Sequence, residues 1–173
     1  MKKVIALSAG EYSDYSVNSF WEIDRDVAED ELIKKCNDPA VLGEPFREFL
    51  TKSTEDIQRL TQTYAPKDTG ELAGSITTLV DAAPMPLWGE TGTILPYAPY
   101  MEYGTPPHWM PIAAITGWAH RHGMNPYAIQ RKIAKYGLAP RYFLRTAILN
   151  SWTDISNNLT DMARAIEDRW SAK

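Results

Sequence analysis

Cysteine is almost absent from this chain of 173 residues, which contains only Cys36. A single cysteine excludes an internal disulfide and any metal cluster built on several thiolates. Long apolar runs are missing too: residues 4–7, the longest such run near the start, fall far short of the ~20 residues of a membrane-spanning helix. They are also too few for the core of a secretory signal peptide. We therefore expect a protein that is made and kept in a cytosol.

Extremes of composition are absent as well. Hydrophobic residues make up 44% and charged residues 23% of the chain, close to the average soluble globular protein. A collagen-like, low-complexity or wholly disordered chain is therefore excluded. The length fits one domain with a small addition. Because Asn37-Asp38-Pro39 forms a turn signal, we expect an accessory unit in residues 1–37 and the main domain in residues 38–173.

Acidic residues are missing from the whole stretch between Glu102 and Asp154. That stretch carries six basic side chains, so with a net charge of −4 for the chain the remainder sums to −10. The six are Arg121, Arg131, Lys132, Lys135, Arg141 and Arg145. They indicate either a surface that meets acidic groups of another protein or another copy, or a solvated basic helix face. Contact with nucleic acid near Tyr127, Tyr136 and Tyr142 is a third possibility, which the net charge and the lack of a binding module oppose.

The accessory unit is predicted to be a hairpin followed by a helix. Residues 3–8 and 16–23 are β-prone and flank a turn-forming segment. Asp24 is suited to cap a helix that continues to about Lys35. So small a unit cannot bury enough apolar surface to be stable alone, so we expect it to dock on the main domain or on a partner.

The main domain is predicted to contain helices and short strands. Residues 44–63 place apolar side chains on one helical stripe, and Pro66 ends that helix. Asn125 is expected to cap a later short helix that Gly137 ends. The remaining elements are strands at 72–80 and 88–95, an aromatic turn at 96–107, helices at 112–121 and 126–136, and one long helix from Pro140 to about Trp170.

Asp68-Thr69-Gly70 matches the catalytic triplet of aspartic proteases. That chemistry needs two carboxylates that share one proton, so this chain would have to supply the second by dimerising. The triplet follows Ala65-Pro66-Lys67 rather than an apolar strand, and no later segment convincingly completes the protease pattern. The structural alternative is a turn in which Asp68 and Thr69 bond the local backbone and Gly70 adopts the turn conformation.

Signals for other catalytic or cofactor sites are missing. On a helix, His120 and His122 would point about 200° apart and could not share one metal ion, and no Cys or Asp clusters with them or with His108. The sequence has no nucleophile elbow, Walker loop or dinucleotide fingerprint. We therefore expect no metal and no cofactor.

Aromatic residues are plentiful, at 11% of the chain. Tyr97, Tyr100 and Tyr103 lie close together in a proline-flanked segment. Because interfaces favour aromatic side chains, these tyrosines are either rigid interface anchors or a packed corner of the core.

Three segments carry a resemblance to a known family. Residues 65–76, Ala-Pro-Lys-Asp-Thr-Gly-Glu-Leu-Ala-Gly-Ser-Ile, fit the pattern A-P-x-D-T-G-x-L-x-x-S-I. Residues 97–105, Tyr-Ala-Pro-Tyr-Met-Glu-Tyr-Gly-Thr, fit Y-A-x-Y-x-E-x-G-T, and residues 139–147, Ala-Pro-Arg-Tyr-Phe-Leu-Arg-Thr-Ala, are an altered A-R-P-F-L-x-x-A. In this order they resemble a phage tail-component family typified by gene product ten of Hong Kong-type siphophages. The resemblance covers about residues 40–173.

The resemblance implies an α+β fold, in which an N-terminal helix and a long C-terminal helix pack on a small twisted antiparallel sheet. It implies a structural virion protein without enzymatic activity or cofactor, which completes the tail or joins head and tail at the neck. Such proteins form rings, commonly hexameric, that contact other neck and tail-tube proteins and let DNA pass without sequence-specific binding. They reside in the virion and, during assembly, in the host cytoplasm. The resemblance assigns structural or assembly roles to Asp68, Thr69, Gly70, Tyr97, Tyr100, Glu102, Gly104, Arg141 and Phe143.

Two features depart from the family pattern. Tyr142 lies within the third motif, and the helices expected at 112–136 are an insertion. They leave open whether the protein is a completion, terminator or joining component. A dimeric aspartic-type protease that uses Asp68 stays open as the alternative from another class.

Overall fold

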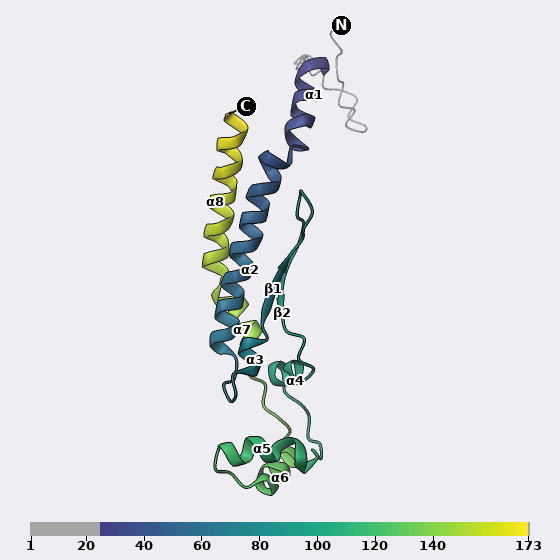
Figure 1. Ribbon diagram of the computed structural model, residues 1–173, viewed down its shortest axis with the longest axis vertical. Coiled ribbons are helices and arrows are strands. Elements are labelled where there is room, and N and C mark those ends of the chain that lie inside the picture. Colours follow the sequence, from purple (N-terminus) through teal and green to yellow (C-terminus); the bar gives the residue numbers. More distant parts are fainter. Residues whose placement is uncertain (1–24, 173) are drawn as a thin grey trace, which may run out of the picture.

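A computed structural model describes residues 25–172 of the chain. The molecule is elongated: α1 (Arg25–Cys36) and the end of α8 (Trp152–Ser171) lie at one end, and α5 (Ile112–Arg121) and α6 (Pro126–Tyr136) lie at the other (Figure 1). Helices and a small antiparallel sheet share the chain, so the expected α+β class is confirmed. The strands expected at residues 3–8 and 16–23 lie outside the described residues.

The long helix α2 (Glu44–Tyr64) forms where the sequence predicts it. Pro45 is the second residue of α2, and the helix ends just before Ala65 and Pro66. A short π-helix, η1 (Pro39–Gly43), precedes it, and the Asp38 carboxylate accepts the N–H of Ala40 at 2.9 Å. Helix α2 packs against α8, α7 (Phe143–Asn150) and the sheet, so it is the central helix of the elongated body (Figure 1).

The sheet is a hairpin of β1 (Thr77–Val80) and β2 (Gly89–Gly92), with Thr77 opposite Gly92. Both strands are shorter than the predicted 72–80 and 88–95. The first strand was expected to begin at Leu72, which instead belongs to the one-turn helix α3 (Glu71–Gly74). Leu72 and Ile76, on either side of the end of α3, are both buried in the core. Helix α2 contacts the sheet, and Gln58 donates to the carbonyl of Ile76 at 2.7 Å.

The expected long C-terminal helix is present as α8, but it begins at Trp152 rather than after Pro140, because Ser151 separates it from α7. Ser151 is fully buried, and its hydroxyl donates to the carbonyl of Ile148 at 2.9 Å. A serine hydroxyl that bonds a nearby backbone carbonyl competes with the regular helix and favours a bend. Apolar periodicity continues across the break, which is why the sequence pattern does not reveal it.

The aromatic segment at 96–107 is not only a turn, because it contains the short helix α4 (Ala98–Tyr103). The two inserted helices, α5 and α6, form as predicted. The Asn125 side chain accepts the N–H of Tyr127 at 2.9 Å at the start of α6, and Gly137 ends it. Both helices pack on each other beyond the end of the main body (Figure 1).

The apolar core is small and lies where α2, α3, α4 and α7 meet. Its buried residues are Ala65, Leu72, Ile76, Ala98 and Phe143. Helix α8, although amphipathic over 20 residues, has no fully buried side chain. Within residues 25–172, every helix is too short or too polar to cross a lipid bilayer.

Candidate assembly site

The Asp-Thr-Gly segment forms a tight turn between α2 and α3. Gly70 has φ = +84°, a conformation that glycine adopts without steric cost. The hydroxyl of Thr69 accepts the backbone N–H of Glu71 at 3.4 Å. The predicted local turn is therefore present at Thr69 and Gly70.

Asp68 makes a different contact from the predicted one. Its carboxylate accepts the Nε–H of Arg121 at 3.0 Å and a second N–H of the same guanidinium, and Nε2 of His122 lies 3.3 Å away. The Arg121 hydrogen bond lowers the pKa of Asp68 below its ordinary value of 3.8, although desolvation acts in the opposite direction. Asp68 thus ties the turn before α3 to the end of α5. The groups that contact it are a guanidinium and an imidazole rather than a second carboxylate, which favours the structural role over the protease dyad.

Glu102 is a buried carboxylate at the end of α4, only 4% exposed. Its two oxygens accept the backbone N–H groups of Leu144 at 2.9 Å and Arg145 at 3.0 Å. These N–H groups lie in the first turn of α7, where no helical carbonyl is available to them. The positive end of the helix dipole also favours a negative charge there. Glu102 therefore caps α7 from a separate element, which gives the second motif a structural function.

Two distant chain segments cross directly after Glu102. Thr105 and Leu138 exchange backbone hydrogen bonds of 3.0 and 3.1 Å. Gly104 has φ = +73°, and a Cβ atom there would lie 2.3 Å from the carbonyl oxygen of Leu138. A Cβ atom on Gly137 would lie 2.0 Å from the carbonyl oxygen of Thr105. Only glycine permits the two segments to approach so closely. The contact joins the start and the end of the helical module formed by residues 105–138.

The third motif packs directly on the second. The backbone N–H groups of Arg141 and Tyr142 donate to the carbonyls of Met101 at 2.9 Å and Glu102 at 3.1 Å. Tyr142, the departure from the family pattern, has φ = +50°, which is uncommon for a residue other than glycine. Phe143 follows it and is buried in the core. The second and third motifs therefore contact each other directly within the folded chain.

Tyr97 joins the first motif to the second, because its hydroxyl donates to the Glu71 carboxylate at 3.3 Å. Burial raises the pKa of Tyr97 above its ordinary value, and the negative charge of Glu71 adds to that effect. Tyr100 and Tyr103 are 58% and 71% exposed, so the packed-corner alternative does not hold for them. The side chain of Arg141 is also exposed. The motifs thus combine internal contacts with an outward-facing aromatic surface.

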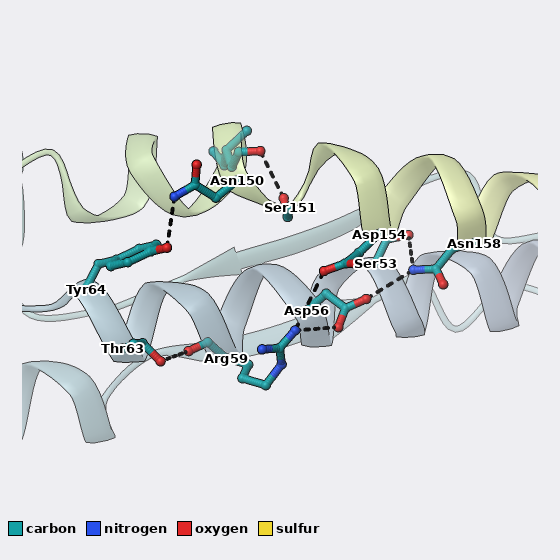
Figure 2. A network of polar contacts seen from close by, with 10 residues as sticks. Ser53, Asp56, Arg59, Thr63, Tyr64, Asn150, Ser151, Asp154 and Asn158 are labelled. Carbon is teal, nitrogen blue, oxygen red and sulfur yellow. Dashed lines mark hydrogen bonds and ion pairs between the residues drawn. The ribbon is translucent and has the colours of Figure 1, made fainter.

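The sequence did not reveal several polar contacts between α2 and the last two helices (Figure 2). Asn158 donates to Ser53 at 3.4 Å and to Asp56 at 3.2 Å, and Arg59 pairs with Asp154 at 3.8 Å. Figure 2 also shows Tyr64, whose hydroxyl accepts an N–H of Asn150 at 2.8 Å. Partners more than 80 residues apart carry no short-range sequence signal. Likewise, the partner of Asp68 could be recognised only as one of six cations in the acid-free stretch.

Large apolar side chains are exposed along the whole described molecule. The hairpin and its flanks carry Leu79, Leu87, Trp88 and Ile94, of which Leu87 is 84% and Ile94 95% exposed. Others lie on the later helices: Tyr127, Tyr136, Ile148, Leu149, Trp152 and Leu159. Among residues 25–172, no group of three or more His, Cys, Asp or Glu side chains is placed to hold a metal ion.

Searches against protein-family models, curated proteins and solved structures found no match to this chain.

Proposed function

We propose that this chain is a structural subunit of a tailed-phage or prophage virion, which completes the tail or joins head and tail by assembling into a ring. The observation that carries the proposal is the amount of large apolar surface that the folded chain leaves exposed, above all Leu87 and Ile94 on the hairpin. Large contiguous apolar patches on soluble proteins commonly mark interaction surfaces. A ring subunit covers it against its neighbours.

The hairpin supports the same proposal through its backbone. Within the described residues β1 and β2 pair only with each other, so each strand has an outer edge without a strand partner. An open sheet edge invites pairing with another chain unless it is covered. A contact that joins different surfaces of successive copies repeats head to tail and closes into a ring when its rotation permits.

The three motifs support an assembly role because each has a structural use. The first makes a turn and an ion pair, and the second and third form the Glu102 cap and the glycine crossing. A rigid core that presents exposed aromatic residues such as Tyr100 and Tyr103 suits a subunit that docks on partners.

Native mass spectrometry over a range of protein concentrations, with and without isolated phage tail tubes, tests this function. We expect one discrete oligomer, alone or on the tube, and its loss when Leu87→Asp is combined with Ile94→Asp. Asn157→Asp, an exposed change on α8, is the control that should keep the oligomer. A monomer under every condition contradicts the proposal.

The protease alternative requires a separate assay. The proposed function predicts that neither the natural protein nor Asp68→Asn cleaves casein or the chain itself. Cleavage that Asp68→Asn abolishes while folding is kept would establish the alternative instead.

A further inference from the structure

The outer face of α6 combines positive charge with tyrosine. Tyr127, Arg131 and Lys135 follow one another at a spacing of four, and Lys132 and Tyr136 lie farther round the helix, with Tyr136 about 180° from Tyr127 at the other edge of the exposed half. All five are exposed, and the two tyrosines are more than 60% exposed. The opposite side, with buried Gln130 and Ile133, faces the rest of the module. We call the five exposed residues the basic α6 face.

Within the part of the chain that the structure describes, this face has no acidic partner. Across residues 25–172, none of the ion pairs involves Arg131, Lys132 or Lys135, and residues 103–153 contain no acid. The Lys135 ammonium lies 5.0 Å from the ring centre of Tyr136. A nearby cation, Arg121, is already bound to Asp68. The face is therefore available to an anionic ligand that also offers aromatic or apolar side chains.

The chain itself contains such a ligand. Residues 11–31 hold eight acidic side chains against one basic side chain, Arg25, a net charge of −7. They also include the aromatic residues Tyr12, Tyr15, Phe20 and Trp21. Helix α1, which contains the end of this acidic segment, lies at the opposite end of the molecule from α6 (Figure 1).

Three acids of the main body are already paired within the fold, and others, such as Glu55 and Glu90, are spread over several elements. Glu48 pairs with Lys52 at 2.7 Å, Asp56 with Arg59 at 3.2 Å, and Asp161 with Arg164 at 3.5 Å; these pairs are within or next to α2 and α8. Their charge is already balanced inside the fold. The acidic segment is thus the strongest complement that the chain offers.

We infer that the basic α6 face of one copy binds the acidic segment, residues 11–31, of a neighbouring copy. The inference rests on the proposed function in one respect, namely that copies of the chain meet. Because α1 and α6 lie at opposite ends of the described molecule, a contact between the acidic segment and the basic α6 face would join different surfaces of successive copies, as a ring needs (Figure 1). Charge attraction sets the direction and speed of docking, and Tyr127 with Tyr136 supplies the aromatic anchors.

Duplex DNA is the competing ligand for this face, and the charges favour it less. With three cations, the face can neutralise about three phosphates, so the slope of log K against log salt is only about −2.7. The net charge of −4 on the whole chain opposes DNA further. An acidic peptide segment, unlike duplex DNA, can be bound tightly by three cations, because aromatic and apolar contacts add to the charge attraction.

Photo-cross-linking in the full-length chain tests the inference directly. Benzoylphenylalanine replaces Tyr127, and light chains are mixed with equal amounts of ¹⁵N-labelled chains before irradiation and mass spectrometry. We expect cross-links to residues 11–31, many of them joining a light to a heavy chain. The same probe at Leu149, exposed on α7, is the control that should not reach the acidic segment. Cross-links confined to single chains would overturn docking between copies.

Charge reversal gives a second test. Arg131→Glu, Lys132→Glu and Lys135→Glu together should lower the association constant at least about tenfold at low salt. The control reverses three exposed cations elsewhere, Lys34→Glu, Lys67→Glu and Arg164→Glu, and should change it little. Adding a second variant with Glu11→Lys, Asp14→Lys, Glu22→Lys and Asp24→Lys should restore association. Failure of that mixture to associate, with both variants folded, contradicts the inference.

The outcomes separate this inference from the proposed function. Rings without cross-links to residues 11–31 overturn the docking site and leave the ring intact. Cross-links between copies without rings support the docking site and contradict the ring. Binding of a labelled DNA duplex that the α6 reversal abolishes, without cross-links to the segment, overturns the inference in favour of nucleic acid.

Discussion

Glu102 shows how one side chain links two parts of the sequence. It lies 42 residues before Leu144 yet accepts that residue's N–H, so it holds α4 against the start of α7. A buried carboxylate with two good donors is favourable, whereas the same donors without an acceptor are costly. The acid in the second motif is therefore explained by helix capping, without a catalytic role.

Replacement of Glu102 by alanine should lower the free energy of unfolding by about 1–3 kcal/mol, because two N–H groups in the first turn of α7 lose their acceptor. Glu102→Gln keeps one acceptor oxygen and should cost less. Urea denaturation measures both. Glu55→Ala, at an exposed position of α2, is the control and should change stability by less than about 0.5 kcal/mol. Equal stability of the two alanine variants would refute the capping role.

Gly104 is required by both its conformation and its surroundings. Gly104→Ala should cost about 2–4 kcal/mol, because alanine resists φ = +73° and its Cβ atom would clash with the carbonyl of Leu138. Gly74→Ala is the matched control: its Cβ atom would meet nothing within 4 Å, and we expect a gain of about 0.4–1 kcal/mol. Thermal denaturation of the two variants checks the contrast, and a similar loss in both would contradict the crossing.

The Asp68 ion pair predicts a dependence of stability on pH. Because the pKa of Asp68 is lowered in the folded chain, its contribution is fully present above the ordinary value of 3.8 and is lost as pH falls through the folded pKa. Asp68→Asn lacks this contribution. The difference between the urea midpoints of the two proteins should be largest near neutral pH and shrink below 3.8. A difference that stays constant from pH 7 to pH 3 would show that the ionised form is not what matters.

At the scale of elements, α5 and α6 form a module attached to the body at few points. Within the described residues, the Thr105–Leu138 bridge joins the two chain segments that enter and leave the module. The ion pair of Arg121 with Asp68 joins the end of α5 to the turn before α3. Segments with few contacts to the rest of a protein unfold locally with a smaller free energy than the core. The ion pair therefore sets how firmly the module keeps its orientation.

Hydrogen exchange measures that prediction. Arg121→Gln should speed the exchange of amides in α5 and α6 several-fold and leave α2 and α8 unchanged, because only the tether of the module is lost. Arg131→Gln, on the exposed face of α6, should have no such effect. Faster exchange throughout the molecule would mean that the module and the body open as one unit.

Elements with local start and stop signals were predicted well. Helix α6 has its cap at Asn125 and its end at Gly137, and α2 lies between proline signals. The misplaced start of β1, the short helix α4 and the break at Ser151 depend on tertiary burial, which short-range patterns do not encode. The motif residues of the site were found from the sequence. Their partners, such as Arg121 for Asp68, were not, because 53 residues separate them.

At the scale of the whole molecule, the described chain has a small core and much exposed apolar surface. The buried cluster around Phe143 contrasts with the exposed Leu87, Trp109 and Trp152. An isolated chain with this distribution gains stability when partners cover it. We therefore expect the melting temperature to rise with protein concentration, as it does for proteins whose folded form is stabilised by association.

Electron microscopy of the largest species that the purified chain forms, alone or on isolated tail tubes, tests the central claim most directly. The account predicts closed rings of uniform size with a central opening. Particles that stay monomeric in both preparations, or that grow only into open filaments, would contradict it.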